Sequence, residues 1–163
     1  MNWWERYIVN YYTQMMKSGK IPDPNYLEPA KIYGEITSTE IYDMLPTEYL
    51  NPNNNSTYKI RRSCWDGKYR LTTTAEMKRF LKWDKTETLG SEPEFSDCDD
   101  YAVVMWGQVK KWTKGLAFGL MITNTPAHAK NIFIDNRKVV WEVEPQGNGL
   151  KELYNKTMSQ YFF

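Results

Sequence analysis

The sequence is poor in the residues that most often carry chemistry or anchor a chain. Its 163 residues include one histidine and two cysteines, and 21 basic side chains offset 20 acidic ones to leave a net charge of +1. No stretch approaches the roughly 20 consecutive apolar residues of a membrane-spanning helix. A near-neutral charge gives no bulk attraction to nucleic acid or to an anionic membrane. We therefore expect neither as a partner.

The sequence is rich in apolar and aromatic side chains, at 41% and 15%. A chain of this length buries about 70% of its unfolded surface, so this composition favours a packed domain over disorder. Residues 1–163 are expected to form a single domain. It would comprise an N-terminal helix and an arm rich in proline and asparagine (1–56), a core (57–150) and a tail (151–163). Because no apolar leader is apparent, we read both cysteines as reduced thiols in a cytoplasmic setting, the host cytoplasm for a phage protein.

Apolar spacing and capping residues predict the main helices and strands. Thr37-Ser38-Thr39-Glu40 and Thr73-Thr74-Ala75-Glu76 both fit a capping box, in which two side chains satisfy free backbone amides reciprocally. The predicted helices cover 3–18, 38–45, 74–83 and 98–112, and the predicted strands cover 116–123, 127–134 and 138–145. Residues 57–71 fit a strand and an ordered loop equally well.

The helix over 98–112 has the strongest signals. One stripe, spaced 4, 3, 4 and 3, contains Cys98, Ala102, Met105, Val109 and Trp112. Ser96 can cap this helix with Asp99 at the reciprocal position, and Gly115 is typical of a residue that follows a helix end. The thiol of Cys98 is therefore expected at the inward-facing N-terminal tip of a buried helix.

The predicted hairpin brings the histidine close to a carboxylate. If the turn is Asp135-Asn136-Arg137, the register is fixed and side chains on one face meet in pairs. In that register the facing pairs are Ile132–Val140, Lys130–Glu142 and His128–Glu144. A turn of another length breaks this pairing, so the predicted contact depends on the turn.

A thiol, an imidazole and a carboxylate are the parts of a cysteine nucleophile. The imidazole takes the thiol's proton, the carboxylate fixes the imidazole's tautomer, and amides at a helix start can receive an oxyanion. Cys98, His128 and Glu144 are thus candidates for nucleophile, base and orienting acid. Glu142 is the alternative acid, although Lys130 is its expected partner. The plainer reading of Cys98 is a small buried hydrophobe.

Three segments carry a resemblance to a known family: Asp97-Cys98-Asp99-Asp100-Tyr101-Ala102, Ala127-His128-Ala129 and Trp141-Glu142-Val143-Glu144-Pro145-Gln146. Their order resembles the papain-like and transglutaminase-like superfamily. The closest variant is the C-terminal cysteine-protease domain of Marasmius oreades agglutinin and related phage proteins. The resemblance covers roughly residues 60–150. It implies an α+β fold in which the nucleophile helix packs on a small antiparallel sheet, with Cys98, His128 and Glu144 as the triad.

The resemblance also implies an activity, namely a cysteine-dependent hydrolase or acyl transferase, and most simply a thiol protease acting on a peptide or protein. Trp65, Asp99 and Gln146 are secondary candidates for binding, although Asp99 is also a typical first-turn helix residue. The related protease uses calcium, but no loop here has EF-hand spacing, so we place no cofactor. The alternative is a non-catalytic binding module on the same fold, such as a phage protein that binds a host factor or small ligand. A structural part of an assembly is a third reading.

Overall fold

The structure is a computed structural model, and it describes residues 22–50, 55–90, 97–124, 127–153 and 158–163, with isolated positions before residue 20. Most of the helix predicted over 3–18 lies outside the described residues. The described positions within it are helical, namely Arg6, Asn10, Thr13, Gln14 and Lys17. Within the described parts of the chain, no helix has the length and apolar character needed to cross a membrane.

The described chain is a mixture of helices and strands, which confirms the predicted α+β class. In chain order its elements are η1 (Pro24–Tyr26), β1 (Gly34–Thr37), α2 (Ser38–Met44), β2 (Glu48–Leu50), β3 (Thr57–Lys59), β4 (Arg61–Ser63), β5 (Lys68–Leu71), α3 (Thr74–Trp83), η2 (Thr86–Thr88), α4 (Cys98–Trp112), β6 (Phe118–Asn124), β7 (Ala127–Ile134), β8 (Val140–Glu144), β9 (Gly149–Glu152) and β10 (Met158–Phe162). The segment 57–71, which fits a strand or a loop in sequence, contains β3, β4 and β5.

A six-stranded sheet organises the fold, in the order β4-β10-β6-β7-β8-β9. Neighbouring strands are antiparallel except β10 and β4, which run parallel. Two-stranded ribbons, β1 with β5 and β2 with β3, extend the structure beside it. The last strand, β10, lies inside the sheet between β4 and β6, although the sequence gives residues 151–163 the pattern of a tail.

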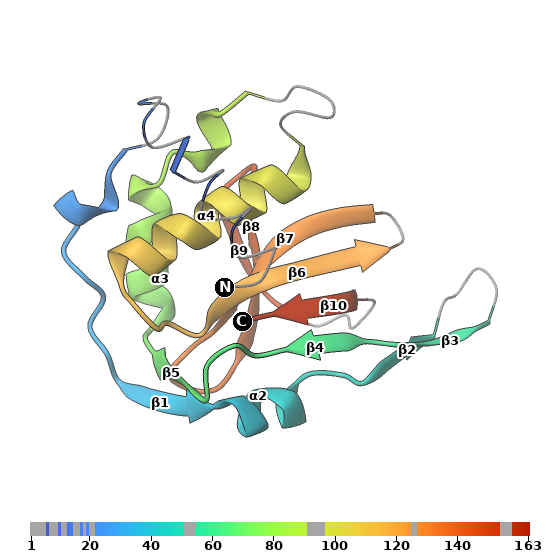
Figure 1. The fold of residues 1–163 in the computed structure, drawn as a ribbon. Helices are drawn as coiled ribbons and strands as arrows, with labels where there is room; N and C mark the ends of the chain where they lie inside the picture. Colours follow the sequence, from blue (N-terminus) through green and yellow to red (C-terminus); the bar gives the residue numbers. More distant parts are fainter. Residues whose placement is uncertain are drawn as a thin grey trace.

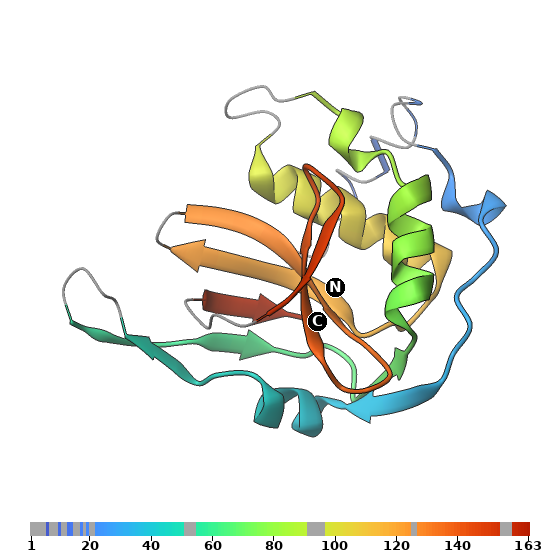
Figure 2. The same cartoon turned by 180° about the vertical axis from the view of Figure 1, so that it is seen from behind.

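The sheet is covered on both faces. Figures 1 and 2 show α4 lying across it with α3 alongside, while α2 and β1 lie on the opposite side. Side chains of β7 alternate between the two resulting clusters. The first includes Met77, Phe80, Met105, Val109, Trp112 and Phe133, and the second includes Ile36, Ile41, Leu71, Ile132, Ile134 and Tyr161. This packing holds α4 and β7 in fixed positions relative to each other.

The helix ends follow the predicted capping residues in part. The Thr37 hydroxyl accepts from Glu40 N at 3.2 Å, and Glu40 accepts from Thr37 N at 2.8 Å, which confirms the first capping box. At α3 the Thr73 hydroxyl accepts from Glu76 N at 3.2 Å, whereas the Glu76 carboxylate pairs with Arg79 at 2.6 Å. The second site therefore keeps the N-cap but not the reciprocal bond.

The hairpin of β7 and β8 has a different register from the predicted one. Ile132 pairs with Glu142, two positions beyond the predicted Val140. The reason is a longer turn, in which the Asp135 carboxylate accepts from the backbone amides of Arg137 at 2.9 Å and Val139 at 3.0 Å. Because side chains alternate along a strand, a shift of two residues leaves every side chain on its predicted face.

Candidate functional site

The start of α4 fixes the position of the candidate thiol. Asp97 is the N-cap: its Oδ1 accepts from Asp99 N at 3.4 Å, and Asp100 Oδ2 accepts from Asp97 N at 3.3 Å. The capping box is thus one residue later than predicted, and Ser96 lies outside the described residues. Cys98 is the first helical residue, as the sequence predicts.

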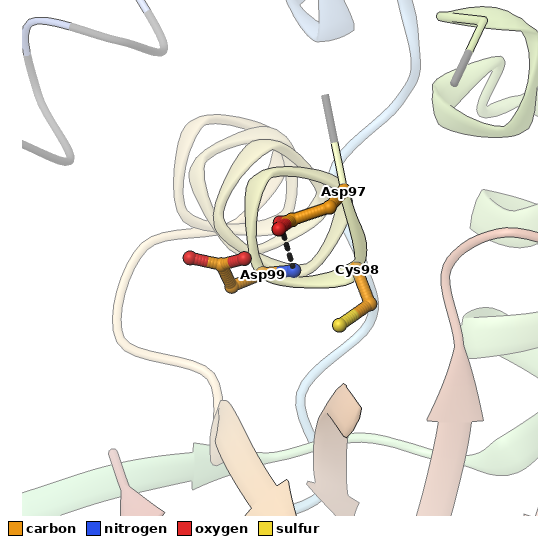
Figure 3. Close-up of side chains that lie close together, drawn as sticks. All are labelled: Asp97, Cys98 and Asp99. Atoms are coloured by element: carbon orange, nitrogen blue, oxygen red, sulfur yellow. Dashed lines mark hydrogen bonds between the residues drawn. The ribbon is translucent and has the colours of Figure 1, made fainter. Parts of the chain in front are cut away.

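The Cys98 thiol joins α4 to the sheet. Its Sγ accepts a hydrogen bond from Ala129 N at 3.3 Å, and the residue is half-buried with a free thiol. Figure 3 shows that its side chain leaves the helix on a different side from the Asp99 carboxylate. Among the described hydrogen bonds, none joins Sγ to the imidazole of His128. The thiol therefore lies against the backbone directly after the histidine.

The imidazole and the carboxylate named from the sequence are in contact. His128 Nε2 lies 3.0 Å from Glu144 Oε2, and both side chains are partly exposed, at 26% and 30%. The other carboxylate oxygen of Glu144 accepts from Gln146 N at 3.3 Å. The contact is present despite the altered register because the shift of two residues keeps both side chains on one face.

Lys130 links the two acids of β8, although the sequence predicts a contact with Glu142 alone. Lys130 Nζ lies 2.7 Å from Glu142 and 3.4 Å from Glu144, and Lys151 Nζ lies 3.1 Å from Glu142. Burial raises the pKa of Glu142, but hydrogen bonds and charges from both lysines outweigh it, so the pKa is lowered. Burial likewise lowers the pKa of Lys130, but Glu142 and Glu144 raise it above its ordinary value. Glu142 is therefore held by lysines, which leaves Glu144 to contact the histidine.

Asp97, Cys98 and Asp99 form a small cluster at the helix start, where their potential ligand atoms lie within 4.8 Å of one another. The Asp97 carboxylate, by hydrogen bond, raises the pKa of Asp99 to about 6, and partial burial adds to this. Calcium takes six to eight oxygen ligands. One thiol and two carboxylates, one of them occupied as a helix cap, do not meet that requirement, and we propose no metal here.

The secondary candidates are spread over the structure. Trp65 packs on Trp106, with ring centroids 5.0 Å apart, and belongs to the apolar cluster under α4. Gln146 is exposed in the turn after β8, and Asp99 is exposed in the first turn of α4. Asp99 thus lies on the same helix as Cys98, and Gln146 lies in the turn that follows Glu144, whereas Trp65 is a packing residue. The backbone amide of Ala129 has no sequence signal, because every residue except proline carries one.

The fold resembles parts of solved lectin structures. No protein-family model matches the sequence, and no curated protein matches it. The PSL1a-E64 complex superposes with a TM-score of 0.62 and 23% identity, over 79% of this chain and 50% of the other. Polyporus squamosus lectin bound to the human-type influenza-binding epitope Neu5Acα2-6Galβ1-4GlcNAc superposes with a TM-score of 0.60 and 24% identity, over 79% and 49%. This chain spans about half the length of those solved chains, and the likeness shows a shared fold.

These neighbours correct the predicted family, activity and partner. One is the PSL1a complex with E64 and the other is Polyporus squamosus lectin bound to a sialylated glycan; a likeness at 23% and 24% identity shows the fold alone and supports no papain-like or transglutaminase-like assignment. The prediction of a thiol protease of the Marasmius oreades agglutinin protease type, with a peptide or protein substrate, is therefore wrong. Residue order alone does not separate a catalytic site from a binding site, because the same residue types occur in both.

Proposed function

We propose that this chain is a non-catalytic binding module whose partner is a carbohydrate. The observation that carries this is the fold shared with Polyporus squamosus lectin, whose structure holds a sialylated trisaccharide. We further propose that the N-terminal ends of α4 and β7, together with the C-terminal end of β8, form the binding site. Its central residues would be Cys98, His128 and Glu144. Asp99 and Gln146 would flank it. Glycan binding is proposed for this chain and not carried over from the whole lectin, because the chain spans only about half of the length of that lectin.

The side chains of this site suit sugar hydroxyls. A carboxylate has about four acceptor positions. The Glu144 carboxylate receives described contacts from His128, Lys130 and Gln146 N, which leaves acceptor capacity. Both Glu144 and His128 are partly exposed, so a ligand can reach them without rearrangement of the core. A planar carboxylate and an imidazole held rigidly on adjacent strands are typical of polar groups that orient a ligand.

The direct test is glycan binding by the intact protein. We expect the intact protein to bind glycans on an array. In a titration with a glycan that binds, Glu144→Gln should lower the affinity at least about tenfold, which corresponds to roughly 1.4 kcal/mol. Glu35→Gln, which removes an exposed carboxylate on β1, is the matched control and should bind as the unmodified protein does. Absence of glycan binding by a folded protein would overturn the proposal.

A second test addresses the non-catalytic part. Intact-mass analysis after incubation with E64 or iodoacetamide reports covalent addition to each thiol, with Cys64→Ala used to isolate Cys98. In the unmodified protein Cys64 is the slow reference thiol, because burial raises its pKa. We expect the rate at Cys98 to be unchanged in His128→Ala. Rapid addition of E64 at Cys98 that disappears in His128→Ala would show a thiol activated by the imidazole and would overturn this part.

A further inference from the structure

Three of the described side-chain hydrogen bonds tie α4 to the strands on which it packs (Figure 1). They join Cys98 Sγ to Ala129 N at 3.3 Å, Ala102 O to Asn131 Nδ2 at 2.9 Å, and Trp106 Nε1 to Phe118 O at 3.1 Å. On the helix these contacts recur every four residues. On the sheet they recur every two residues, because Phe118 of β6 lies opposite Phe133 of β7.

The two spacings agree in length. Four residues of an α-helix rise about 6 Å, and two residues of a β-strand span about 6.7 Å. One alignment of α4 on β7 therefore satisfies all three hydrogen bonds. A screw displacement of the helix by one residue turns its side chains by about 100° and removes these contacts. The hydrogen bonds together define the register of the helix on the sheet.

Asn131 makes the central contact of the three. Its side chain is fully buried, and its Nδ2 donates to Ala102 O at 2.9 Å and to Gly119 O at 3.2 Å. A carbonyl oxygen has two lone pairs, so each can accept from this amide in addition to a backbone partner. The carboxamide thus joins α4, β6 and β7, one helical turn after Cys98 and two residues after Ala129.

The other end of the same carboxamide shows what its polarity contributes. The Asn131 Oδ1 is buried and accepts no hydrogen bond from the described residues. A buried acceptor without a donor costs free energy, and a leucine of similar size would avoid that cost. Flipping the amide would place Oδ1 against two carbonyl oxygens, so its orientation is fixed. What Asn131 adds over an apolar side chain is therefore its pair of donors.

We propose that Asn131 is a positioning residue for the site at the start of α4. Its carboxamide sets the register of the helix on β7, and that register holds the Cys98 thiol against the Ala129 amide, next to His128. Functional groups need supporting residues whose own conformations are fixed by packing and hydrogen bonds, and Asn131 meets both conditions. The role of this register in ligand binding rests on the proposed function, whereas the register itself does not.

The first test is made by NMR on the unmodified protein. A long-range HNCO experiment detects the coupling across a hydrogen bond, and we expect a correlation from the Asn131 side-chain nitrogen to the Ala102 carbonyl carbon. The carboxamide of Asn136, an exposed residue, is the internal control and should show none. Absence of the Ala102 correlation, at a sensitivity that detects the backbone couplings of α4, would overturn the proposal.

The second test compares Asn131→Leu with Phe133→Leu in the Cys64→Ala background. Both substitutions change a buried side chain on the same face of β7, but only the first removes donors to α4. We expect iodoacetamide labelling of Cys98 at pH 7 to slow at least about threefold in Asn131→Leu, because an N–H donor stabilises the reactive thiolate. The rate should be unchanged in Phe133→Leu. Urea unfolding of both variants measures the loss of stability, which is all that a packing role would change.

The outcomes separate this inference from the proposed function, since neither readout needs a ligand. An unchanged or faster rate in Asn131→Leu, or an equal slowing in Phe133→Leu, would assign Asn131 to packing and overturn the inference even if glycans bind. If Asn131→Leu does not fold, the NMR correlation decides. A protein that binds no glycan but shows the correlation and the slower labelling would lose the proposed function and keep this inference.

Discussion

The two halves of β7 differ in what surrounds them. From Asn131 to Ile134 every residue is fully buried, and the side chains enter the clusters on both faces of the sheet. From Ala127 to Lys130 only Ala129 is buried, and His128 and Lys130 contact charged partners near solvent. One strand thus combines a packed half, which fixes position, with a polar half, which presents functional groups. Substitutions should therefore separate into those that change stability and those that change binding.

The largest effect on stability is expected at Phe133. Its side chain is fully buried among residues of α3, α4 and the sheet. Phe133→Ala should lower the free energy of unfolding by about 4 kcal/mol, since a Phe-to-Ala change in a core loses contacts and leaves a cavity. Urea denaturation followed by circular dichroism measures it, with Phe133→Leu as the milder control. A loss below about 1 kcal/mol would contradict the description of this half as packed.

The next effect concerns Gly119, which pairs with Ile132 across β6 and β7. A Cβ at this position would overlap the backbone carbonyl of Phe162 in β10. Gly119→Ala should therefore cost about 3 kcal/mol, because backbone atoms cannot move aside as a flexible side chain does. Gly67→Ala, where a Cβ meets nothing within 4 Å, is the matched control. Equal thermal stability of the two variants would show that β10 is not held against β6 as described.

A pH-dependent effect is expected at Glu142, which lies beside the boundary between the two halves. The lysines around it lower its pKa in the folded protein, so its stabilisation is present above the unfolded pKa of about 4.3 and is lost as pH falls through the folded value. At pH 7, Glu142→Gln should cost about 1.5 kcal/mol by weakening charged hydrogen bonds. Urea unfolding at pH 7 and at pH 3 should show a smaller difference for the variant. An equal difference for both proteins would contradict the assigned pKa.

The helices at the site were predictable from local signals. The bounds of α4 agree with the prediction because an apolar stripe and a glycine after the helix mark the same segment, although the N-cap is Asp97 and not the predicted Ser96. The turn after β7 was not predictable, since its length depends on how the Asp135 carboxylate binds two backbone amides and the Trp141 indole. The resulting error of two residues did not affect the His128–Glu144 contact, because it preserves the face of each side chain.

Two features had no local signal. β10 pairs with β4, almost 100 residues earlier in the chain, and with β6, and a strand of five residues is too short for its pattern to show a central position in a sheet. The detailed fold had no local signal either, because Cys98, His128 and Glu144 give an order of residue types without the fold that carries them. The structural comparison supplied that fold and changed the partner from a peptide to a proposed glycan.

The smallest effect on stability is expected at His128, in the polar half of β7. Its contact with Glu144 is partly exposed, and exposed polar or charged contacts of this kind contribute at most about 1 kcal/mol. His128→Ala should therefore change the free energy of unfolding by less than about 1 kcal/mol while it lowers glycan affinity, since the imidazole orients the Glu144 carboxylate. Urea denaturation and glycan titration of the same preparation measure both quantities. A large loss of stability with normal binding would reverse the division of β7, because the histidine would then be part of the scaffold.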